Sequence, residues 1–251
     1  MSGRKPRHAV YLLPNAFTTA ALFFGFVAVV EAVRGDWQGA AMSVVIAALL
    51  DACDGRIARW TGTQSAFGAE YDSLADAVSF GVAPALIAYQ WSLSAWGKLG
   101  LCAAFCYCAA AALRLARFNA QSGGADRRFF IGIPSPAAAL LIVSFVATMD
   151  AWDFHGAKAA PYAAAMCFAA ALTMVSGVRY YSFKELNIRR RRVPFRHTAL
   201  FFAAAAAVYA LADTFMELLL ALLGAYFVSG YIYAAWTGWK YFTRKRKAPG
   251  N

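Results

Sequence analysis

The chain has 251 residues, of which 61% are hydrophobic and 15% are charged, so it is far more apolar than a soluble domain. Its formal net charge of +11 does not indicate nucleic-acid binding, because the basic residues cluster in short segments between long apolar runs. The composition excludes a soluble globular protein and indicates an integral membrane protein. We expect the first apolar run to remain as a membrane helix, because no small-residue cleavage site closes it.

Apolar runs long enough to span a bilayer follow one another along the chain. They predict eight transmembrane helices, over residues 11–33, 38–60, 71–92, 97–118, 132–150, 159–181, 196–213 and 216–239. Only Asp213, Thr214 and Glu217 separate the last two runs, so six or seven spans are the alternatives. We expect one all-α membrane domain over residues 1–251, with a catalytic core over about 1–190 and two further helices over about 194–243.

Lysine and arginine residues are concentrated before the first span, after the fourth, after the sixth and at the end of the chain. The connections on the opposite side carry fewer positive charges and more tryptophan. Because positively charged loops stay in the cytoplasm, we expect both termini and these basic loops on the cytoplasmic side of the cell membrane.

Four aspartates interrupt the apolar pattern where the second predicted span ends and the third begins. Spacings of three and four residues place each pair on one helix face, beside small residues; the aspartates are Asp51, Asp54, Asp72 and Asp76, and the small residues are Gly55, Ala58 and Gly68. Four converging carboxylates near a membrane require cations, and a ligand set of oxygen atoms alone favours Mg²⁺ or Mn²⁺. Two such ions beside an arginine suit a diphosphate.

An ion or proton pathway in a transporter is the alternative interpretation of aspartates within a membrane protein. A conduction path would distribute polar residues through the midplane of several spans. These carboxylates lie within 26 residues at one interface, which disfavours the transporter.

The pattern Asp-x2-Asp-Gly-x2-Ala-Arg-x8-Gly-x3-Asp-x3-Asp, from Asp51 to Asp76, resembles the signature of the CDP-alcohol phosphotransferases. These membrane enzymes move a phosphatidyl or related group from a CDP-linked donor to an alcohol. The resemblance implies that the four aspartates hold two divalent metal ions and that Asp76 is also the general base. It places contacts with the CDP-diacylglycerol donor at Asn15, Thr18, Gly55, Ala58, Arg59, Ser65 and Gly68. It also implies a homodimer.

The acceptor alcohol is indicated by further segments, which resemble the phosphatidylserine synthase branch of the family; they cover residues 73–85, 113–119, 130–139 and 174–186. The implied reaction joins CDP-diacylglycerol and L-serine to give phosphatidylserine and CMP, by direct attack or through a covalent intermediate. Glycerol 3-phosphate and inositol are the alternative acceptors. The carboxylate of serine needs a cation, and the candidates for binding serine or phosphate are Arg117, Asn119, Arg179, Arg114 and Lys184. Anchoring of cytoplasmic loops is the competing explanation for these basic residues.

Overall fold

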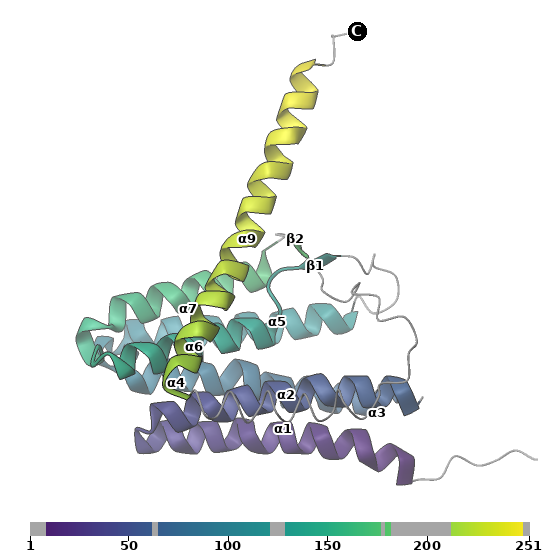
Figure 1. The fold of residues 1–251 in the computed structure, drawn as a ribbon, viewed down its shortest axis with the longest axis vertical. Helices are drawn as coiled ribbons and strands as arrows, with labels where there is room; N and C mark the ends of the chain where they lie inside the picture. Colours follow the sequence, from purple (N-terminus) through teal and green to yellow (C-terminus); the bar gives the residue numbers. More distant parts are fainter. Residues whose placement is uncertain (1–8, 62–64, 121–128, 177–178, 182–211, 248–251) are drawn as a thin grey trace, which may run out of the picture.

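The computed structural model describes residues 9–61, 65–120, 129–176, 179–181 and 212–247 (Figure 1). Within these ranges the chain is almost entirely helical. The α-helices are α1 (Ala9–Arg34), α2 (Trp37–Thr61), α3 (Ala66–Asp76), α4 (Ala83–Trp91), α5 (Lys98–Ala120), α6 (Ser135–Ala151), α7 (Ala160–Val175) and α9 (Ala212–Lys247). A π-helical turn, η1 (Ala77–Val82), joins α3 to α4, and short 3₁₀ turns occur at η2 (Leu93–Trp96) and η3 (Gly156–Lys158).

The helices agree with the predicted all-α membrane protein. The first six predicted spans correspond to α1, α2, the continuous run of α3, η1 and α4, and then α5, α6 and α7. Three stretches of the described chain are long and apolar enough to cross a membrane, namely Asn15–Arg34, Lys98–Ala120 and Thr214–Ile232, and α6 and α7 are shorter apolar helices. The predicted eighth span lies within α9, whereas nearly all of the seventh lies outside the described residues.

The predicted helix over 159–181 is wrong at its carboxyl end. Helix α7 stops at Val175 because the backbone of Ser176 is extended, with ψ of 163°. The chain then forms strand β2 (Arg179–Tyr181), which pairs antiparallel with β1 (Phe129–Ile131) and sets Arg179 opposite Ile131. Arg179 therefore belongs to a short two-stranded ladder and not to an apolar helix.

The helices α1 to α7 lie side by side in a bundle, and α9 crosses α6 before leaving it (Figure 1). Small side chains fill much of the bundle interior, which lets the helix backbones approach closely, as in other membrane proteins. The hairpin of α1 and α2 illustrates this, since its fully or almost fully buried side chains include Ala28, Ala32, Ala40, Ala41 and Ala47.

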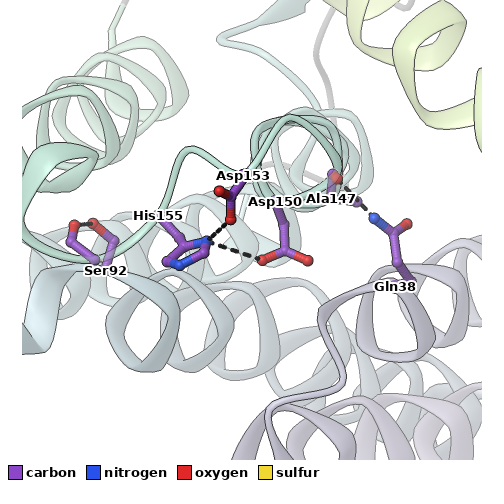
Figure 2. Close-up of polar contacts among 7 residues, drawn as sticks. Gln38, Ser92, Ala147, Asp150, Asp153 and His155 are labelled. Atoms are coloured by element: carbon purple, nitrogen blue, oxygen red, sulfur yellow. Dashed lines mark hydrogen bonds and ion pairs between the residues drawn. The ribbon is translucent and has the colours of Figure 1, made fainter.

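Side-chain hydrogen bonds and ion pairs connect helices and loops at one end of the bundle (Figure 2). Gln38 of α2 donates a hydrogen bond to the Ala147 carbonyl of α6 at 2.8 Å, and the Ser92 hydroxyl donates to the Gly156 carbonyl at 2.7 Å. His155 Nδ1 lies 3.7 Å from Asp153 Oδ1 and 3.9 Å from an oxygen of Asp150. The four aspartates of the sequence pattern lie toward the opposite end, in the carboxyl-terminal half of α2 and in α3.

The π-helical turn η1 packs closely against α1. A Cβ atom added at Gly25 would lie 2.3 Å from Ser79 Oγ and 2.9 Å from the Ser79 Cα atom. The Ser79 hydroxyl donates to the Ala21 carbonyl at 3.2 Å, and the buried Tyr107 hydroxyl of α5 donates to the Phe80 carbonyl at 2.9 Å. These contacts fix η1, which follows directly after Asp76.

Replacing Gly25 by alanine should lower the thermal unfolding midpoint in detergent by several degrees, because the added methyl group meets backbone atoms of η1 and overpacking costs about 1–3 kcal/mol. Gly224→Ala is the matched control, since a Cβ atom at Gly224 of α9 meets nothing within 4 Å. That control should be neutral or slightly stabilising. Equal unfolding midpoints for the two variants would contradict the close approach of η1 to Gly25.

Candidate functional site

Three carboxylates from two helices converge at one end of the bundle. Asp51 comes from α2, Asp72 lies within α3, and Asp76 is the last residue of α3. One oxygen from each lies within 4.8 Å of the others, and all three side chains are partly buried. The four-residue spacing of Asp72 and Asp76 sets both on one face of α3, which explains why they meet Asp51 together.

Asp54 lies one helical turn beyond Asp51 and is almost fully buried, with 5% of its surface exposed. The Thr18 hydroxyl of α1 donates a hydrogen bond to Asp54 Oδ2 at 2.8 Å. Asp54 is not one of the three mutually close carboxylates, but its charge is near enough to act on Asp72. The structure therefore brings three predicted metal ligands together and holds the fourth beside them through α1.

The carboxylate cluster suits a hard divalent cation. Asp72 Oδ1 is buried and accepts no hydrogen bond from any residue in the described ranges. A buried carboxylate oxygen without a donor requires another source of positive charge. The ligand set contains carboxylate oxygens only, which Mg²⁺ and Mn²⁺ prefer.

Residues predicted to contact the donor lie where α1 and α3 begin. The Ser65 hydroxyl accepts a hydrogen bond from the Gly68 amide at 3.0 Å and so caps the amino end of α3. A Cβ atom added at Gly68 would lie 3.1 Å from Ser65 Oγ and 3.6 Å from Asn15 Oδ1, so these three predicted residues adjoin one another. The absence of a side chain at Gly68 leaves the polar groups accessible.

The same region is braced by residues that the pattern did not identify. The Asn15 carbonyl accepts a hydrogen bond from the Thr19 hydroxyl at 2.7 Å, and the hydroxyls of Thr19 and Tyr71 lie 2.9 Å apart. Tyr71 precedes Asp72 in the sequence, so this contact joins α1 to the carboxylate cluster. Gly55 is partly buried in α2, where Ala58 and Arg59 also lie.

The predicted acceptor residues on α5 have different partners. Arg114 Nη1 donates to the Ser135 hydroxyl at 2.8 Å, and Arg117 Nη1 donates to the Val175 carbonyl at 3.3 Å. Asn119 Nδ2 donates to the hydroxyl of Ser73 at 2.9 Å, next to Asp72. Arg114 thus faces the start of α6, Asn119 faces α3, and Arg117 faces the end of α7.

Of the two remaining acceptor candidates, Arg179 lies in β2, and Lys184 falls outside the described residues. The sequence does not identify Ser73 or Ser135 as site residues, because a single serine has no spacing pattern that indicates its partner. Their position within segments 73–85 and 130–139, which resemble the phosphatidylserine synthase branch, is the sequence signal that could have identified them.

A family model described as CDP-alcohol phosphatidyltransferase matches residues 11–175. A Helicobacter pylori protein named CDP-diacylglycerol–serine O-phosphatidyltransferase is 38% identical over 182 residues, covering 72% of this chain and 77% of that protein. A Methanocaldococcus jannaschii protein of the same name is 39% identical over 137 residues, covering 55% of this chain and 61% of that protein.

An archaetidylserine synthase from Methanothermobacter thermautotrophicus is also similar, with 31% identity over 170 residues, or 67% of this chain and 69% of that protein. The family model covers well over half of the chain and contains the whole carboxylate cluster. The chain therefore belongs to the CDP-alcohol phosphatidyltransferase family.

Proposed function

We propose that this transferase moves the phosphatidyl group of CDP-diacylglycerol to the hydroxyl of L-serine and releases CMP, a step of phospholipid biosynthesis. The observation that carries the proposal is the convergence of Asp51, Asp72 and Asp76 within a complete family pattern. Serine is favoured as the acceptor because curated relatives from Helicobacter pylori and Methanocaldococcus jannaschii are named for that substrate.

Two divalent ions, Mg²⁺ or Mn²⁺, are the proposed cofactors, with Asp51, Asp54, Asp72 and Asp76 as their ligands. When bound, they neutralise the carboxylates and stabilise negative charge on the diphosphate and on the departing CMP. Thr18 orients Asp54 through its hydrogen bond, so we assign it a positioning role in addition to its predicted contact with the donor.

The donor would lie along the amino ends of α1 and α3. Asn15, Ser65 and Gly68 adjoin one another there, and Gly55 follows Asp54 on α2. We assign the donor headgroup to these residues, together with Ala58 and Arg59. The acyl chains of the donor would remain in the surrounding membrane.

Asp76 is the proposed general base. It takes the proton of the serine hydroxyl as the hydroxyl oxygen attacks phosphorus, while the bond between phosphorus and the CMP oxygen breaks. A carboxylate is a weak base for an alcohol, so holding both substrates in line must supply much of the acceleration. Direct attack needs no nucleophile other than serine, and we prefer it to a covalent intermediate.

We also propose that the enzyme lies in the cell membrane with its termini and carboxylate cluster on the cytoplasmic side, because the basic segments of the sequence fall at the ends of predicted spans on the same side as the cluster. We further propose that the chain spans the membrane eight times. The catalytic core covers about residues 1–190, and two additional helices cover about residues 194–243. We also propose a homodimer, which the family resemblance implies.

Asp76→Asn should reduce CMP release by about 100-fold or more, because it removes the proposed base, and should preserve binding of CDP-diacylglycerol. Turnover is followed as CMP released from purified enzyme in lipid micelles. Asp153→Asn, at the opposite end of the bundle, is the control and should retain activity. Wild-type turnover by the Asp76 variant would refute the base assignment.

Removal of divalent cations with EDTA should stop the reaction, and added Mg²⁺ or Mn²⁺ should restore it. Without substrates, Mn²⁺ should raise the unfolding midpoint of the wild type, because ion binding relieves repulsion among the carboxylates. Asp72→Asn should diminish that rise. Activity that survives complete chelation would show that the cluster works without a metal.

The acceptor is identified by supplying CDP-diacylglycerol with L-serine, glycerol 3-phosphate or inositol and measuring CMP. We expect release with serine alone. Release with another alcohol but not with serine would assign the enzyme to a different branch of the family. A transporter would release CMP with none of them and would accumulate solute in sealed vesicles.

A further inference from the structure

Arg114 is a cation that forms no ion pair within the described part of the chain. Its Nη1 atom donates to Ser135, and its Nε atom is buried and has no hydrogen-bond partner among the described residues. Asp76 and Tyr226 lie close enough to interact with its charge, but no carboxylate in the described ranges forms an ion pair with it. A buried guanidinium donor in this state needs an acceptor, and carboxylates and phosphates are the acceptors that a guanidinium binds most strongly.

Ser135 is the group that fixes one side of this guanidinium. It is completely buried and is the first residue of α6. The chain reaches it through Gly132, whose φ of 81° favours glycine and where a Cβ atom would lie 2.4 Å from the Met174 carbonyl oxygen. Pro134 and Pro136 stiffen the backbone on either side. The hydroxyl of Ser135 is therefore held by rigid backbone.

The geometry favours the acceptor as the source of the anion. In L-serine the hydroxyl and the carboxylate are borne by adjacent carbon atoms, so a residue that binds the carboxylate must lie near the base that receives the hydroxyl proton. Arg114 lies near Asp76, whereas the predicted donor residues Asn15, Ser65 and Gly68 belong to α1 and the start of α3. A guanidinium also matches the planar shape of a carboxylate.

We propose that Ser135 is a positioning residue, which holds the Arg114 guanidinium so that its free Nε group binds the carboxylate of the acceptor. This inference rests on the proposed function. It would make the enzyme selective for acceptors that carry a carboxylate, because any other acceptor would leave the Arg114 Nε–H group without a partner.

The test compares L-serine with L-serinamide, which keeps the hydroxyl and the amine but lacks the carboxylate. Ser135→Ala should raise KM for L-serine about fivefold, as expected for the loss of one hydrogen bond, and should leave KM for CDP-diacylglycerol unchanged. The preference for serine over serinamide in kcat/KM should fall by a similar factor. Ser135→Thr keeps a hydroxyl and should recover part of the preference.

Ser144→Ala is the matched control, because Ser144 is another completely buried serine of α6, and its hydroxyl donates only to the Leu141 carbonyl of the same helix. It should preserve the preference for serine. If Ser135→Ala is too unstable to purify, Arg114→Lys takes its place, because an ammonium keeps the charge but lacks the planar fork; it too should reduce the preference.

An unchanged preference in the folded Ser135→Ala enzyme, or in Arg114→Lys when that variant takes its place, would overturn the inference. A raised KM for CDP-diacylglycerol with an unchanged KM for serine would also overturn it and would assign Arg114 to the donor phosphate. These outcomes differ from failure of the proposed function, in which the wild type itself would release no CMP with serine.

Discussion

The mutual repulsion of carboxylates is the constraint on which the rest of this structure depends. Oxygens of Asp51, Asp72 and Asp76 lie within 4.8 Å of one another. Two unit charges 4 Å apart repel by about 4 kcal/mol at an effective dielectric constant of about 20. Such a cluster is maintained only if the helices that carry it are held together by other contacts and if bound cations or protons offset its charge. The fold supplies the contacts, and the carboxylate oxygens are suited to divalent cations.

The contacts that hold the cluster join helices that are separated in the sequence. Gly25 lets α1 reach the π-helical turn, and Tyr107 satisfies the Phe80 carbonyl within that turn. Thr18 ties α1 to Asp54 on α2. Because η1 begins directly after Asp76, these contacts limit the movement of the proposed base. Rigid placement matters more than basicity for a carboxylate that must accept a proton from an alcohol.

The sequence predicted the parts of the fold and site that repeat or have fixed spacing. Long apolar runs located the helices, and the spacing of Asp72 and Asp76 placed both on one face. The end of α7 was misplaced because apolar residues continue past Val175, and a three-residue strand such as β2 is too short to show an alternating pattern. The Ser135 contact with Arg114 spans 21 residues, and only the folded chain shows such a pair.

Helix α9 shows how a segment beyond the matched family region bears on the site. The family model ends at residue 175, yet α9 packs along α6, and its buried or partly buried residues include Met216, Leu219, Leu223 and Tyr226. Glu217 accepts a hydrogen bond from Trp152 at 2.9 Å, and the Tyr231 hydroxyl lies 2.5 Å from that of Thr173. These contacts fasten α9 to the carboxyl ends of α6 and α7. Because α6 carries Ser135 and Tyr226 is near enough to influence the charge of Arg114, α9 would stabilise the proposed acceptor side, whereas α1, α2 and α3 build the proposed donor side.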